Sequence, residues 1–145
     1  FVYPNLSLIA RLGAAQAVRE LVLPELEAYF GHGFERLCRE ALPALYAREG
    51  IRAGFEVGEY WDKDTQIDVV GLRQDRWTDL GECKWGRVNS VAALRTELRE
   101  RLPRFPNARQ ATLGLRYFTR QRMRVTPDSA SHERWHCLEE LYELE

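Results

Sequence analysis

An α/β fold with a mixed central sheet is predicted by the alternation of two periodicities along the chain. Apolar residues recur at helical spacing over residues 14–23, 26–46 and 91–102. Short segments rich in β-branched and aromatic residues, separated by polar turns, predict strands at the positions 52–61, 66–72, 77–85, 111–119 and 134–138. The order is therefore α-α-β-β-β-α-β-β, which predicts a mixed sheet flanked by helices, with an extra N-terminal helix.

The boundaries of these elements follow from proline, glycine and capping residues. Pro24 breaks or restarts the helical pattern of residues 14–23. Gly50 suits the end of the second helix, and Ser90 suits the N-cap of the third. Pro103 is expected to end that third helix.

Composition places the chain among globular domains. Its 145 residues, 45% hydrophobic and 30% charged, are enough for one domain with a real core and exclude a disordered chain. The three cysteines are widely separated and form no CxxC pair, which favours a reducing, cytoplasmic compartment over a disulfide scaffold. No signal peptide or membrane-spanning run is found. Because the chain starts with Phe1 and not Met, we expect it to be a piece of a longer protein.

The most informative stretch runs from residue 65 to residue 85 and predicts a β-hairpin. If its turn is centred near Asp75, antiparallel pairing places Asp68 opposite Glu82 on one face of the sheet. Side chains alternate along a strand, so Lys84 shares the face of Glu82 while Cys83 points to the other. Two carboxylates and an ammonium group on an apolar hairpin are costly to bury, and a divalent metal ion would compensate them.

These residue types suit phosphodiester hydrolysis. Asp68 and Glu82 could bind Mg²⁺ or Mn²⁺ through their oxygens, and Glu35, on the preceding helix, could support the metal cluster. The cation would activate a water molecule and neutralise charge on a phosphate. Lys84 could orient or help deprotonate that water, or stabilise the phosphate.

The segments 29–35, 68–70 and 81–85, in this order of helices and strands, resemble the PD-(D/E)XK nuclease-like superfamily. They are most similar to the uncharacterised C-terminal domain of archaeal-type (DEXX-box) ATPases, which is also found in bacteria. Ile67 stands where the motif has its proline, while both acids and the lysine are kept.

The resemblance implies a restriction-endonuclease-like core of α-β-β-β-α-β order, with metal-dependent cleavage of nucleic acid, DNA in the first place. It also implies an ATPase domain upstream in the same polypeptide, with residues 1–25 as the lead-in or linker helix and residues 26–145 as the nuclease-like domain. No GxxxxGK[ST] loop is present in these residues. A second class of function stays open: a catalytically silent nuclease-fold module for nucleic-acid binding, or for docking or dimerising the ATPase as a homodimer.

A basic half of the chain is hidden by the net charge of −1. Residues 87–124 contain ten arginines and only two glutamates. Arginine binds phosphate through two parallel hydrogen bonds, so a groove for the nucleic-acid backbone is one interpretation. Its candidate residues are Arg87, Arg95, Arg99, Arg120 and Arg122. The alternative is a solvated face with local pairs such as Glu97–Arg101.

Residues 132–136 match HExxH, the zinc-binding helix of metallopeptidases. That chemistry needs a helix, but this segment is predicted to be part of the last strand. On a strand, His132 and His136 would lie about 13 Å apart, too far to share one zinc. A zinc peptidase is therefore the weaker interpretation.

Overall fold

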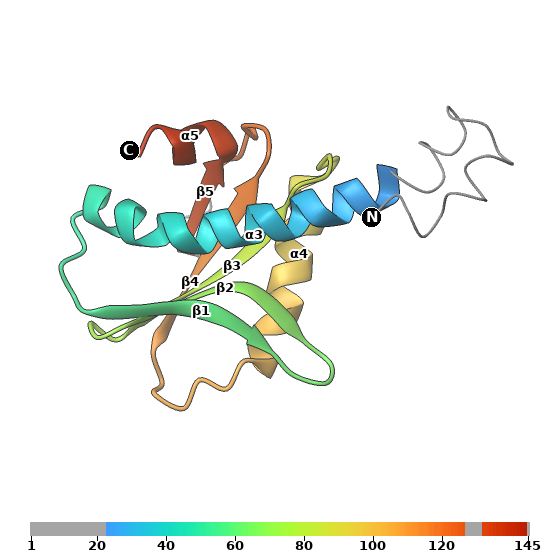
Figure 1. Ribbon diagram of the computed structural model, residues 1–145. Helices are drawn as coiled ribbons and strands as arrows, with labels where there is room; N and C mark the ends of the chain where they lie inside the picture. The colour runs from blue at the N-terminus through green and yellow to red at the C-terminus, as the bar shows by residue number, and fades with distance from the viewer. Residues whose placement is uncertain (1–22, 127–131, 145) are drawn as a thin grey trace, which may run out of the picture.

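The computed structural model describes residues 23–126 and 132–144, which form one sheet with helices on both of its faces (Figure 1). The predicted α/β class is confirmed. The elements in chain order are α3 (Leu23–Arg48), β1 (Phe55–Trp61), β2 (Gln66–Arg73), β3 (Trp77–Lys84), α4 (Val91–Arg101), the 3₁₀ turn η3 (Leu102–Arg104), β4 (Thr112–Thr119), β5 (Glu133–Cys137) and α5 (Leu138–Tyr142).

The sheet is mixed, and its five strands lie in the order β1-β2-β3-β4-β5. Strands β1, β2 and β3 pair antiparallel, whereas β4 is parallel to β3 and β5 is parallel to β4. The parallel pair β3–β4 requires a crossover, and α4 supplies it. The predicted α-β-β-β-α-β order is therefore the order of the structure, with β5 added at the edge.

The β2–β3 hairpin has the register that the sequence predicts. Val69 pairs with Gly81 and Leu72 with Thr78, so the turn is centred on Asp75. Arg76 closes the turn with a φ of 68°, in the left-handed region. The backbone pairing of the hairpin ends at Val69 and Gly81, and Asp68 and Glu82 are the next residues.

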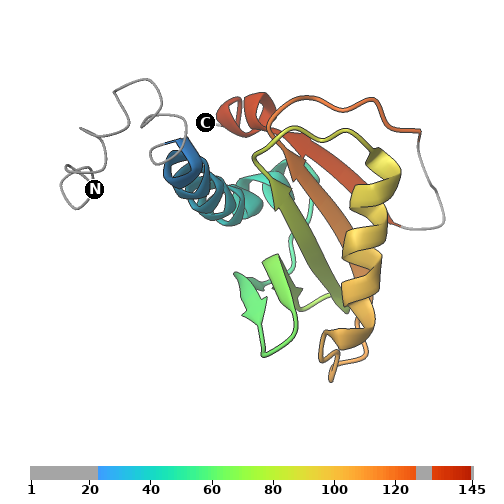
Figure 2. The same cartoon turned by 90° about the vertical axis from the view of Figure 1, so that its right-hand side faces the viewer.

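The two long helices cover opposite faces of the sheet (Figure 2). Phe34, Leu42 and Tyr46 of α3 pack on Val69 and Phe118 in one core. A second core joins Leu94 and Leu98 of α4 to Leu115 and Tyr117 of β4 and is completed by the partly buried side chains Val88, Leu102 and Trp135. Ser90 caps α4 as predicted, because its hydroxyl accepts a hydrogen bond from the Ala93 N–H at 3.1 Å.

Helix α3 is longer than the sequence indicates. It begins at Leu23 with Pro24 in its first turn, a position where a missing N–H costs little, and it continues through Pro43. The predicted helix over residues 14–23 lies outside the described residues, apart from its last residue. The short helix α5 was not predicted, because five residues give too little periodicity to recognise.

Two expectations from the composition concern the cysteines and membrane-spanning helices. The three cysteines are free and buried. Within residues 23–126 and 132–144, no helix is both long enough and apolar enough to span a bilayer.

Candidate active site

Strands β2 and β3 bring the two predicted acids together. Val69 and Gly81 are the last residue pair of the hairpin; Asp68 directly precedes Val69 and Glu82 directly follows Gly81, so the same register, continued by one residue, places the two acids opposite each other. Both are buried, at 6% and 3% exposure. The Nζ of Lys84 lies 3.6 Å from the Glu82 Oε1, which places three of the four predicted catalytic residues in one cluster.

Asp68 is held in position by groups from three elements. Its Oδ2 accepts a hydrogen bond from the Cys83 N–H at 3.0 Å, and Gln66 Nε2 donates to its Oδ1 at 3.4 Å. The guanidinium of Arg39, on α3, donates to the Asp68 carbonyl at 2.9 Å. Glu35, one helical turn before Arg39, approaches from the same helix and is close enough for its charge to act on Asp68. Residues from α3, β2 and β3 therefore meet at this carboxylate.

The pKa values of both acids are raised. Burial raises the pKa of Glu82 to about 7, the nearby charge of Asp68 adds to the rise, and the charges of Arg101 and Lys84 oppose it. Burial also raises the pKa of Asp68, against the Cys83 hydrogen bond, and the charge of Glu35 raises it further. The cluster thus holds more negative charge than its surroundings compensate.

Lys84 remains a cation. Partial burial lowers its pKa, but the hydrogen bond to Glu97 and the charges of Glu82 and Glu97 outweigh burial, so the pKa of Lys84 is raised overall. Its Nζ lies 3.1 Å from the Glu97 Oε2. At neutral pH this side chain therefore donates hydrogen bonds and carries a positive charge.

Sequence reasoning missed two members of the cluster, Glu97 and Arg101. Both lie on α4, four residues apart and so on one helix face. In place of the Glu97–Arg101 pair named under the alternative of a solvated face, Arg101 contacts the Glu82 carboxylate and Glu97 contacts Lys84. Their four-residue spacing on the helix after the Glu-x-Lys strand could have indicated that they share a helix face. Which residues they contact depends on the rotation of α4 about its axis.

The five predicted phosphate-binding arginines fall into two groups. Arg95 and Arg99 both contact the buried carboxylate of Glu133, at 2.9 and 3.0 Å, and join α4 to β5. Arg87 and Arg120 are exposed and line a hollow of about 280 Å³ beyond the end of β3. Arg122 is exposed nearby. The nucleic-acid groove stays a prediction, and the second group is better placed for it.

The carboxylates of the cluster are the candidate ligands for a divalent metal ion. Among the described residues, no group of three or more acidic, histidine or cysteine side chains is placed to hold a metal ion. Mg²⁺, however, is commonly bound by one or two carboxylates together with water and substrate phosphate. The buried pair Asp68 and Glu82 fits this pattern in donor type and charge, because burial raises the pKa of both carboxyls and a bound cation would favour their ionised forms.

The two histidines of the HExxH match pack against different aromatic rings. The segment from Glu133 is strand β5, as predicted. His132 packs edge-on against Trp77, while His136 lies on the ring of Phe118 in the core.

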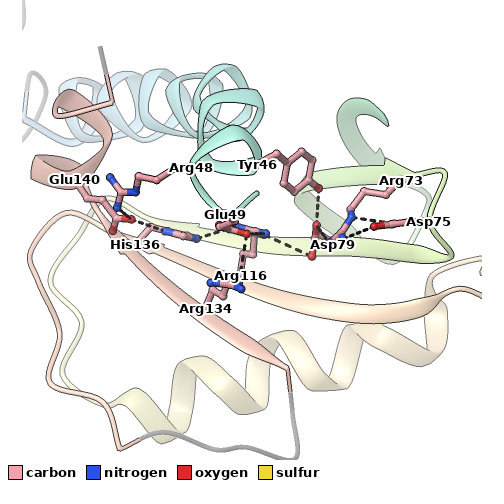
Figure 3. A network of polar contacts seen from close by, with 10 residues as sticks. All are labelled: Tyr46, Arg48, Glu49, Arg73, Asp75, Asp79, Arg116, Arg134, His136 and Glu140. Atoms are coloured by element: carbon pink, nitrogen blue, oxygen red, sulfur yellow. Dashed lines mark hydrogen bonds and ion pairs between the residues drawn. The ribbon is translucent and has the colours of Figure 1, made fainter. Parts of the chain in front are cut away.

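A second polar cluster, not predicted from the sequence, lies under the C-terminal half of α3 (Figure 3). Arg116 of β4 is 1% exposed and donates two hydrogen bonds of 2.7 Å to Glu49. The hydroxyl of Tyr46 donates to Asp79 at 2.5 Å, and Arg73 Nη1 lies 3.4 Å from the same Asp79 oxygen. Every charge in this set has an opposite partner, so it connects α3 with β2, β3 and β4 as a structural network.

The network continues to the last two elements. His136 Nδ1 lies 3.1 Å from Glu140 Oε1, to which Arg48 of α3 also donates at 2.8 Å. Burial lowers the pKa of His136, against the hydrogen bond to Glu140. Helix α5 is thereby tied to the end of α3.

The comparisons with known proteins give one match. Neither the curated proteins nor the solved structures include a match to this chain. A family named DUF234, described as archaeal and bacterial proteins of unknown function, matches residues 1–96. That range contains α3, β1, β2 and β3, and with them Glu35, Asp68, Glu82 and Lys84. The chain therefore belongs to the DUF234 family of archaeal and bacterial proteins.

Proposed function

We propose that this domain is a metal-dependent nuclease of the PD-(D/E)XK type, which hydrolyses phosphodiester bonds of nucleic acid, with DNA as the first substrate to test. One observation carries the proposal: two buried carboxylates, Asp68 and Glu82, face each other at the end of a hairpin with Lys84 beside them. Burying two like charges is expensive, and such an arrangement is typical of functional sites.

Asp68 and Glu82 would hold Mg²⁺ or Mn²⁺, with Glu35 in support from α3. The cation would supply a water molecule of lowered pKa and offset the charge that develops on the phosphate. The protein's own part is to keep the two carboxylates apart from bulk water. The Cys83 N–H and Arg39 fix Asp68 for this role.

Lys84 would orient the attacking water and stabilise negative charge on the phosphate oxygens. Its raised pKa favours these roles over deprotonation of the water, because a group that stays protonated cannot accept a proton. Glu97 holds the ammonium group in place at 3.1 Å.

The partners in this proposal are nucleic acid and an ATPase domain in the same polypeptide. The resemblance of segments 29–35, 68–70 and 81–85 to the C-terminal domain of archaeal-type ATPases supports the second partner. We also propose a cytoplasmic location, supported by the three free, buried cysteines.

A second function is favoured by the ion pairs of the cluster. Arg101 contacts Glu82, and Glu97 contacts Lys84, so Glu82 and Lys84 have oppositely charged partners without a metal ion. In this alternative the domain keeps the nuclease fold as a silent module that binds nucleic acid, or that docks or dimerises the ATPase.

A cleavage assay separates the two functions. The purified chain, together with its ATPase part, is incubated with Mg²⁺ or Mn²⁺ and with supercoiled, linear and single-stranded DNA and with RNA. We expect Asp68→Asn and Lys84→Met each to lower the cleavage rate about a hundred-fold or more, as loss of one electrostatic group in a catalytic site does. Glu56→Gln, an exposed acid on β1, is the matched control and should cut like the wild type.

Either of two results would reject the enzyme: no cleavage of any of these substrates, or equal cleavage by the wild type and Asp68→Asn. Calorimetric titration with Mn²⁺ adds a readout that does not depend on activity. Heat of binding that disappears in Asp68→Asn supports the metal site, and no binding in the wild type supports the silent module.

A further inference from the structure

A row of aromatic rings begins directly after the candidate catalytic lysine. Trp85 follows Lys84, and its ring stacks on Phe30 of α3 with the centroids 5.7 Å apart and the planes at 30°. Tyr29 continues the row against Phe30, edge-on, at 5.7 Å. Tyr29 is 72% exposed and Phe30 46% exposed, which is unusual for rings of this size.

The other end of the row carries positive charge. The guanidinium of Arg120 lies over the Trp85 ring at 4.6 Å from its centroid. A guanidinium that lies over an aromatic ring can still donate hydrogen bonds from its N–H groups to a ligand. Arg120 and Arg87 line the same hollow of about 280 Å³, whose lining contains no acidic residue. Within the described part of the chain, neither arginine forms an ion pair.

We propose that this row is a platform for unpaired nucleotides, so that the substrate is single-stranded or carries an unpaired end next to the cleavage site. The exposed faces of Tyr29 and Phe30 stack bases, and Arg87 and Arg120 hold the phosphates. The inference rests on the proposed function for its account of cleavage, and it names the form of nucleic acid that the site takes.

The chemistry of the surface selects this occupant. Aromatic faces combined with a positively charged groove are the pattern by which proteins bind single strands without reading sequence. In a duplex, the base faces are already stacked on one another and cannot reach Tyr29 or Phe30. A protein partner would need the apolar area but not the two unpaired arginines.

Binding is measured by fluorescence anisotropy in EDTA, so that nothing is cut. The probes are a labelled oligothymidine of roughly 16 nucleotides, which covers one site of this kind, and a blunt duplex of equal length. We expect the single strand to bind at least ten-fold more tightly than the duplex. Loss of one base stack in Tyr29→Leu or Phe30→Leu should weaken it roughly 5- to 150-fold. Leucine keeps the apolar surface and removes only the ring.

Arg120→Gln should weaken binding and lower the slope of log affinity against log salt by about 0.7 for each lost phosphate contact. Arg52→Gln, at an exposed position before β1, is the charge-matched control and should change neither the affinity at fixed salt nor the ring dependence. Thermal unfolding of each variant checks that the fold is kept, as expected for exposed side chains.

The outcomes separate this inference from the proposed function. Equal affinity for strand and duplex, unchanged in the two leucine variants, overturns the platform even if the protein cuts DNA. A change of oligomeric state in those variants without loss of DNA binding also overturns it and makes the row a protein contact. Ring-dependent binding of the single strand without any cleavage supports the platform and rejects the nuclease.

Discussion

Replacing Glu82 by glutamine should make the stability of the protein less sensitive to rising pH. The folded state raises the pKa of this carboxyl from its ordinary 4.5 to about 7, chiefly by burial. Because the folded protein binds this proton more tightly than the unfolded chain, the corresponding stability is fully present below pH 4.5. It is lost as the pH rises through about 7.

The size of the effect follows from the two pKa values. Each pKa unit corresponds to about 1.4 kcal/mol, so the rise to about 7 amounts to about 3 kcal/mol of unfolding free energy. Glu82 is only 3% exposed, so solvent screening does not reduce the figure appreciably. A neutral glutamine of the same shape does not titrate and therefore does not lose this contribution.

The assay is urea unfolding of the wild type and Glu82→Gln, followed by tryptophan fluorescence in steps from about pH 4.5 to about pH 8. Only the difference between the two proteins counts, because titrating groups that do not interact with Glu82 cancel in it. We expect this difference to move by about 3 kcal/mol in favour of the variant as the pH rises. A flat or opposite dependence would show that Arg101 keeps Glu82 ionised, and it would refute the reasoning about excess charge in the cluster.

Glu49→Gln is the control of opposite sign. Burial pushes the pKa of Glu49 up, but the hydrogen bonds and charge of Arg116 outweigh burial and lower it. The stability from Glu49 is therefore present above its ordinary value of 4.5 and is lost as the pH falls through the folded-state pKa. The difference between this variant and the wild type should accordingly move in the wild type's favour as the pH rises.

Three further predictions concern stability and are checked by the same urea titrations. Arg116→Ala leaves the carboxylate of Glu49 buried without its main partner and removes one of the two cations beside Asp79, so it should cost roughly 3–5 kcal/mol; a loss below about 1 kcal/mol would contradict the network. Gly71→Ala places a Cβ 2.1 Å from the Tyr46 hydroxyl and should cost about 1–3 kcal/mol, and an unchanged midpoint would contradict it. The Tyr117 hydroxyl is buried and has no hydrogen-bond partner among the residues that the structure describes, so Tyr117→Phe should stabilise the protein by about 1 kcal/mol; destabilisation would show that the hydroxyl is bound.

The hairpin shows how much of the site could be predicted. Its strands were recognised because apolar and polar residues alternate, and its register was recognised because the polar turn is short and symmetric about Asp75. Once the register is known, the position of Asp68 opposite Glu82 follows from strand geometry alone. The cap at Ser90 was equally accessible, since capping depends on four consecutive residues.

The partners of the charged side chains could not be predicted in the same way. Arg95 and Arg99 were expected to face nucleic acid, but they contact Glu133, which is 38 and 34 residues away in the chain. Arg116 is one of the ten arginines between residues 87 and 124, yet it is among the most buried side chains of the described residues. A series of charged residues in the sequence gives no sign of which of them lies beneath a helix.

The sequence by itself determined the order of the elements, the register of β2 and β3, and the meeting of Asp68 and Glu82, because these depend on periodicity within about 20 residues of chain. The tertiary structure decided the rest of the cluster. Arg39, Glu97 and Arg101 reach it only because α3 and α4 pack on opposite faces of the sheet at one particular rotation. Packing of the apolar cores sets that rotation, and no local pattern of charges encodes it.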